Sequence, residues 1–135
     1  MKKTTEVEPQ VIYRLLSGDA CGYYDRANNT IVVDPRLSPR QRRITEAHER
    51  IHAERGDVCP HTEWLEIKME AAVDRELALR LIPWTALLDA ARWSSEPHEI
   101  AEELDVDEDL LEIRIAHLSD TERGRLNRVS RENAA

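Results

Sequence analysis

The first third of the chain alternates short apolar runs with turn residues, whereas the rest repeats apolar positions at helical spacing. Apolar runs at 11–16 and 22–25 precede Ala27-Asn28-Asn29, a turn sequence, and then the β-branched run Thr30–Val33. This pattern predicts a hairpin over Cys21–Val33. Beyond it, the spacing predicts helices over 39–55, 63–82, 84–93, 97–104 and 108–118. Strands followed by helices indicate an α+β fold, with a small β-sheet packed on helices.

The helix expected over 39–55 has clear start and stop signals. Ser38 is a favourable N-cap, Pro39 suits the first helical position, and Gln41 completes a capping box. Gly56 provides the residue that can end the helix in a left-handed conformation. The boundaries of this helix are therefore the best defined of the chain.

Length and charge narrow the class of protein. The 135 residues suit a single domain over 1–135, with a core at about 11–93, an acidic helical segment at about 94–118 and a frayed polar tail at 119–135. The net charge of −8 argues against a general nucleic-acid or membrane-surface binder. Two cysteines form no disulfide framework, so we expect a cytoplasmic protein, with Cys21 as a small buried side chain.

The helix expected over 39–55 contains the motif H-E-x-x-H, at His48, Glu49 and His52. Residues four apart share a helix face, so the two imidazoles can bind one cation. Imidazole nitrogens suit Zn²⁺, and Glu49 beside them is the expected general base, the catalytic residue. The alternative is a polar edge of an amphipathic helix, with Glu49 solvated. Ile44, Ala47 and Ile51 lie on the same stripe as the histidines and favour the metal site.

A zinc site needs a third protein ligand, and the next helix offers several carboxylates. Glu70 lies on the apolar stripe of that helix with Val73 and Leu77. We expect Glu70 to bind the metal and Asp74 to accept the outer N–H of a ligand histidine. Asp74 or Glu76 as the ligand, and ordinary surface salt bridges for these acids, are the alternatives.

The motif and its neighbours resemble the ImmA/IrrE family of zinc metallo-endopeptidases. The resemblance rests on Ile31-Val32-Val33-Asp34, on Thr45-Glu46-Ala47-His48-Glu49-Arg50-Ile51-His52-Ala53, and on the second helix, which in the family has the form E-x-E-A-D-x-F-A-x-x-L-L-x-P. Here that helix runs from Glu70 through Asp74 to Leu81-Ile82-Pro83, and it departs from the pattern at Ala72, Val73 and Glu76. The resemblance implies a cytoplasmic zinc-dependent endopeptidase. It also implies a protein substrate, for instance a helix-turn-helix transcriptional repressor that is cut at one specific site.

Two further functions are compatible with parts of the sequence. Residues 100–118 have the rhythm of a helix-turn-helix, with Asp105 where glycine is common, which would suit a small DNA-binding protein. However, residues 96–112 contain nine acids and no Lys or Arg, and a phosphate backbone would repel them. The other alternative is a non-catalytic binder that keeps the metal, against which the intact Glu49 speaks.

Two further expectations concern the strand before the motif helix and the loop after it. The strand Thr30–Val33 would be an edge strand that pairs with an extended substrate by β-augmentation. Cys59 and His61 flank Pro60 beyond the motif, and we expect this pair to be incidental.

Overall fold

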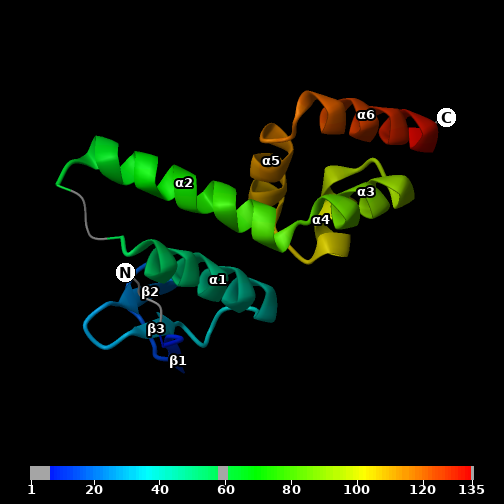
Figure 1. Ribbon diagram of the computed structural model, residues 1–135. Coiled ribbons are helices and arrows are strands. Elements are labelled where there is room, and N and C mark those ends of the chain that lie inside the picture. The colour runs from blue at the N-terminus through cyan, green and yellow to red at the C-terminus, as the bar shows by residue number, and fades with distance from the viewer. Residues whose placement is uncertain (1–6, 58–60, 135) are drawn as a thin grey trace. The chain divides into compact units, whose positions relative to one another are not determined.

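The computed structural model describes residues 7–57 and 61–134, which divide into two compact units, Met1–His61 and Thr62–Ala135. The first unit holds a small sheet and one helix, and the second is helical (Figure 1). The expected α+β class, with strands first and helices after them, is confirmed. The expected single domain over 1–135 stays a prediction, because compactness does not test whether the two units unfold together.

The first unit contains a three-stranded sheet in the order β1-β3-β2. Its strands are β1 (Gln10–Tyr13), β2 (Gly22–Asp25) and β3 (Thr30–Val33). β3 is antiparallel to β2, which confirms the predicted hairpin, and parallel to β1. The expectation that Thr30–Val33 is an edge strand is wrong. Because β1 and β2 bond to both of its sides and all four of its residues are buried, β3 has no free edge for a substrate strand.

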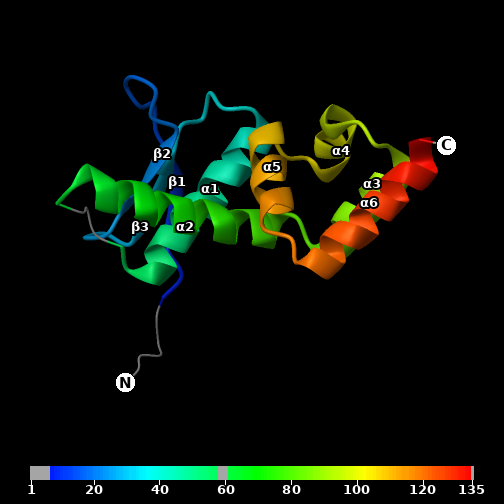
Figure 2. The ribbon, with the colours of Figure 1, turned by 90° about the horizontal axis from the view of Figure 1, so that it is seen from above.

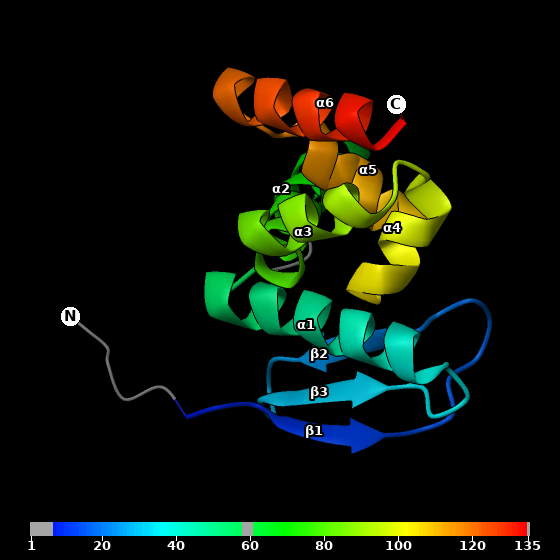
Figure 3. The same cartoon turned by 90° about the vertical axis from the view of Figure 1, so that its right-hand side faces the viewer.

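Helix α1 (Pro39–Arg55) packs against β2 and β3 (Figure 3). The approach is closest at Gly22, where an added Cβ would lie 2.6 Å from the Val32 carbonyl oxygen and 2.7 Å from Thr45 Cγ2. Only glycine leaves room for α1 to lie this close to β2. Cys21, directly before Gly22, is exposed, so the expectation of a buried thiol is wrong. The reason is that its neighbour, not Cys21, meets the helix.

The link from β3 to α1 is held by the carboxylate of Asp34, which is only 3% exposed. It accepts hydrogen bonds from the backbone N–H groups of Leu16 (3.1 Å) and Arg36 (2.9 Å), and from the Arg36 guanidinium at 3.0 and 2.6 Å. These bonds, the Arg36 side chain above all, lower the pKa of Asp34 far below its ordinary value. These hydrogen bonds therefore hold the segment between β3 and α1 in place.

Both ends of α1 form as predicted. The Ser38 hydroxyl accepts the Gln41 N–H at 3.1 Å, and Pro39 begins the helix. Gly56 ends the helix with a φ of 69°, and the N–H of Asp57 turns back to the His52 carbonyl at 3.2 Å. This turn brings the residue after Gly56 back toward the last turn of the helix.

The second unit consists of helices, and most of them begin and end close to the predicted residues. They are α2 (Glu63–Leu81), α3 (Trp84–Trp93), α4 (Pro97–Leu104), α5 (Glu108–Ala116) and α6 (Asp120–Ala134). The expected frayed tail at 119–135 is wrong, because the chain there forms α6. Val129 of α6 is buried with Leu88 and Ala91 of α3, so apolar contact with α3 stabilises a helix that its polar sequence did not indicate (Figure 2).

The turn between α4 and α5 is built around Asp105, which has a φ of 58° in place of the usual glycine. Val106 is fully buried behind it, and the Asp107 side chain caps α5 by accepting the Leu110 N–H at 2.8 Å. Arg114 of α5 is 5% exposed and donates to the carbonyl oxygen of Ile82 at 2.7 Å. The buried guanidinium thus joins α5 to the end of α2. In the part of the chain that the structure describes, we find no helix with the length and apolar character needed to cross a membrane.

Candidate metal centre

The side chains of His48, Glu49 and His52 gather on α1. Each offers one ligand atom, and these atoms all lie within 4.8 Å of one another. The imidazole rings are 4.8 Å apart between centroids and meet edge to face at 74°. Helical spacing explains the gathering, because positions 48 and 52 lie one above the other on adjacent turns. The group could hold a metal ion.

His48 and Glu49 are neighbours in the chain and also in space. The Nδ1 atom of His48 lies 2.9 Å from Oε2 of Glu49. An ionised carboxylate only accepts hydrogen bonds, so Nδ1 of His48 is the donor in this pair. When this imidazole is neutral, its Nε2 therefore carries the lone pair that a metal requires.

His52 has an acidic partner that does not belong to the motif. Its Nδ1 lies 2.9 Å from Oδ2 of Asp57, the residue that follows the helix-ending glycine. Arg55 donates from Nε to the same oxygen, also at 2.9 Å. A carboxylate behind the imidazole orients the ring, fixes its tautomer and raises the basicity of the other nitrogen. The pair His52–Asp57 is the arrangement that supports a metal-binding histidine.

All four side chains are partly or largely buried. The exposed fractions of the side chains are 24% for His48, 13% for Glu49, 11% for His52 and 14% for Asp57. In so little water, charged groups interact more strongly than at the surface. Two imidazoles with carboxylates beside them match the donor set that binds borderline metals such as Zn²⁺. The residues present therefore fit the metal that the motif indicates.

Asp57 was not among the site residues predicted from the sequence. Its contact with Nδ1 of His52 is of the kind expected of Asp74, which was to accept the outer N–H of a ligand histidine. A signal was present, because an acid directly after a helix-ending glycine is carried back over the last turn. His52 lies in that last turn, five residues before Asp57.

Glu70 and Asp74 lie four residues apart on α2 in the second unit, and both are half-buried. The predicted apolar stripe on α2 is confirmed at Val73 and Leu77, which are buried. Since each unit is described by itself, the roles of Glu70 as third ligand and of Asp74 as its support stay predictions. The pair at Cys59 and His61 lies partly outside the described residues, because Cys59 is not among them.

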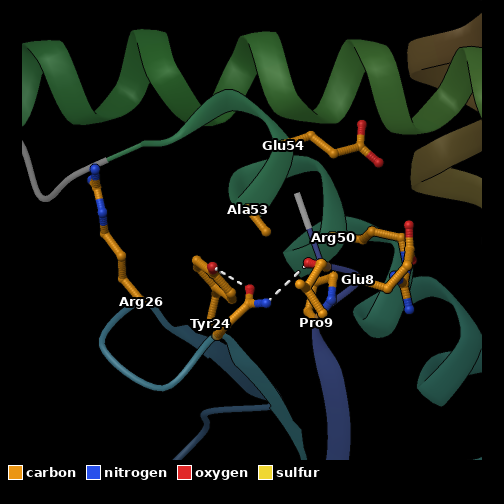
Figure 4. Close-up of a pocket in the computed structure, with 9 residues that line it drawn as sticks. Glu8, Pro9, Tyr24, Arg26, Arg50, Ala53 and Glu54 are labelled. Carbon is orange, nitrogen blue, oxygen red and sulfur yellow. Dashed lines mark hydrogen bonds and ion pairs between the residues drawn. The ribbon is translucent and has the colours of Figure 1, made fainter. Parts of the chain in front are cut away.

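The first unit also contains a pocket of about 360 Å³ beside the C-terminal half of α1 (Figure 4). Tyr24 donates to Asn29 Oδ1 at 2.7 Å on its floor, and Arg50 on its wall bonds to Glu8 at 2.7 Å and Glu46 at 3.1 Å. None of His48, Glu49 and His52 lines the pocket. The pocket is therefore distinct from the candidate metal centre.

Comparison of the chain with protein-family models, with curated proteins and with solved structures finds no match. The resemblance to the ImmA/IrrE proteases therefore depends on the motif residues quoted above.

Proposed function

We propose that this chain is a zinc-dependent endopeptidase that cuts a protein partner at a defined bond. The observation that carries the proposal is the gathering of His48, Glu49 and His52, with Asp57 behind His52 at 2.9 Å. A carboxylate behind a histidine of the motif is the supporting contact that metal-binding histidines commonly have. Figure 3 shows that this helix lies over the sheet, so its backbone is well supported.

In this proposal, some side chains would bind the metal and another would transfer protons. His48 and His52 would hold the metal, and Glu70 of the second unit would complete the ligand set. Zinc in such a site supplies Lewis acidity, which lowers the pKa of water and polarises a carbonyl group. Glu49 would take a proton from the attacking water and return it to the leaving amine. The closeness of Glu49 Oε2 to Nδ1 of His48, at 2.9 Å, supports this role because it would keep the carboxylate near the metal.

A transcriptional repressor of the helix-turn-helix class is the substrate that we propose. This partner class, and a cytoplasmic location, come from the resemblance to the ImmA/IrrE proteases. A protein substrate that adds a strand to the sheet would pair at β1 or β2, since β3 is bonded on both sides. Selectivity for one protein would then depend on contacts beyond the cut bond.

Metal content is the first test. Elemental analysis of the purified chain should find about one zinc per chain, and His48→Ala should lose it. His98→Ala, which alters an exposed histidine on α4, is the matched control and should keep the metal. Wild-type protein that binds no zinc would contradict the proposal.

Cleavage is the second test. The chain is incubated with zinc and with helix-turn-helix proteins encoded next to its gene, and an unfolded casein serves as a general substrate. We expect one discrete cut in a repressor, lost in Glu49→Gln, because the amide cannot accept a proton. Glu54→Gln makes the same change elsewhere on α1 and should cleave normally. Equal cleavage by Glu49→Gln would exclude Glu49 as the base.

A further inference from the structure

A groove runs between α3 and α4 in the second unit, which pack against one another. Its volume is about 320 Å³, large enough for one long side chain. Side chains from one face of α3 and from the last turn of α4 line it, namely Ala86, Asp89, Ala90, Trp93, Glu103 and Leu104. The groove thus combines an apolar floor with two carboxylates and an indole.

Trp93 is the most unusual member of the groove. It is the last residue of α3 and is 60% exposed, although it is among the largest apolar side chains of the chain. An exposed indole beside carboxylates gives a cation both a π-face and anionic partners. The face of this indole is therefore accessible to a ligand.

The two charged side chains that line the groove, Asp89 and Glu103, are both carboxylates. Asp89 forms an ion pair with Arg92, with 2.9 Å between Oδ1 and Nη1. Glu103 makes no ion pair within the described residues. The C-terminal end of α4 adds the negative pole of the helix, and its last turn contains no basic residue. The surrounding segment 96–112 has nine acids and neither Lys nor Arg. A cation is therefore the ligand that this groove can attract.

We propose that the groove between α3 and α4 binds an arginine side chain of the protein partner. A guanidinium suits it better than an ammonium group, because it stacks on an indole and bonds to carboxylates through several N–H donors. The proposal deepens the proposed function, on which it rests, by giving the substrate protein a docking contact away from the bond that is cut. A nucleic acid is excluded as the occupant by repulsion from the same carboxylates.

The test uses the full chain carrying Glu49→Gln, so that binding is measured without cleavage. A fluorescein-labelled peptide, Gly-Ser-Leu-Arg-Leu-Ser-Gly, is titrated at low salt and followed by fluorescence anisotropy. Companion peptides have citrulline, which is neutral and nearly isosteric, or lysine in place of the arginine. We expect the arginine peptide to bind at least about tenfold more tightly than the citrulline peptide, with lysine between them. Added salt should weaken binding.

Variants locate the site. Trp93→Ala should weaken binding of the arginine peptide about tenfold and Glu103→Gln about threefold to tenfold. Glu112→Gln is the matched control: it removes one exposed negative charge from α5, outside the groove, and should change the affinity less than about twofold. Circular dichroism verifies that each variant folds, as expected for exposed positions.

Three results would overturn the proposal. Equal binding of the arginine and citrulline peptides would show that no cation is recognised. Equal weakening by Glu112→Gln and Glu103→Gln would show a diffuse acidic field rather than a groove. Self-association in sedimentation experiments that Trp93→Ala abolishes would make a second copy of the chain the occupant. Because no zinc or cleavage enters this measurement, its failure would leave the endopeptidase proposal standing, and loss of zinc binding would leave this result unaffected.

Discussion

Removal of the Asp57 carboxylate should weaken the binding of zinc while the fold persists. Asp57 lies in the turn after α1, and its Oδ2 accepts from Nδ1 of His52 at 2.9 Å. In Asp57→Ala the ring of His52 loses its orienting partner and the negative charge behind it. Asp57→Asn keeps an oxygen that can accept the Nδ1 proton but loses the charge, so its effect should be smaller.

The magnitude follows from the geometry of this contact. Loss of a carboxylate behind a metal-binding histidine typically weakens metal affinity by about 10- to 100-fold, which is about 1.4 to 2.7 kcal/mol. The pair is largely buried, with side chains 11% and 14% exposed, so solvent screens it little. However, Arg55 shares the same oxygen at 2.9 Å and offsets part of the negative charge. We therefore expect the lower half of the range, about 10- to 30-fold for Asp57→Ala.

Competition with a chromogenic chelator measures the zinc affinity of each variant. Asp19→Ala is the control, since it removes an exposed aspartate from the loop before β2 in the same unit. Thermal unfolding of the metal-free proteins separates loss of affinity from loss of fold. If Asp57→Ala binds zinc within about twofold of the wild-type affinity, the His52–Asp57 contact does not support a metal ligand and the reasoning is refuted.

Four further predictions concern the acids of α2 and the stability of the two units. Glu70→Ala should weaken zinc binding more than Asp74→Ala does in the same chelator titration, because a lost ligand costs more than a lost supporting contact; the reverse order would assign the metal to Asp74. Gly22→Ala should destabilise the protein by roughly 1–3 kcal/mol in denaturant unfolding, since its Cβ would meet Val32 and Thr45 at under 3 Å. Gly124→Ala on α6, where nothing lies within 4 Å, should instead be neutral or stabilising. The wild type should be more stable than Asp34→Asn above the ordinary aspartate pKa of 3.8, and the difference should shrink as the pH falls below it, because the pKa of Asp34 is lowered by the Arg36 hydrogen bonds. A difference in thermal midpoint that stays constant from pH 7 to pH 3 would contradict this account.

Local signals in the sequence predicted much of both units. The Ala27–Asn29 turn predicted the hairpin, Ser38 and Gly56 predicted the ends of α1, and Pro83 separated α2 from α3. Such features depend on a few consecutive residues whose backbone preferences act in the same way in any fold. The H-E-x-x-H spacing is of the same kind, because a single helix is enough to bring His48 and His52 together.

The order of the strands and the state of the tail depended on contacts between distant residues. The run Thr30–Val33 shows the same β-branched pattern whether one or two strands flank it, so only the pairing with β1 revealed it as central. The tail after Asp120 has a polar sequence, and its helix is stabilised by the burial of Val129 against α3. Neither result can be derived from periodicity alone.

The candidate metal centre also has some features that follow from the sequence and others that depend on the fold. The sequence by itself determined which two histidines can face one cation and which glutamate stands beside them, because helical geometry is local. The contact of Asp57 with His52 is local as well, because it follows from the reversal of the chain at Gly56 over the last turn of α1. The tertiary structure decided how deeply these side chains are buried, because burial depends on which segments pack together rather than on the spacing of residue types.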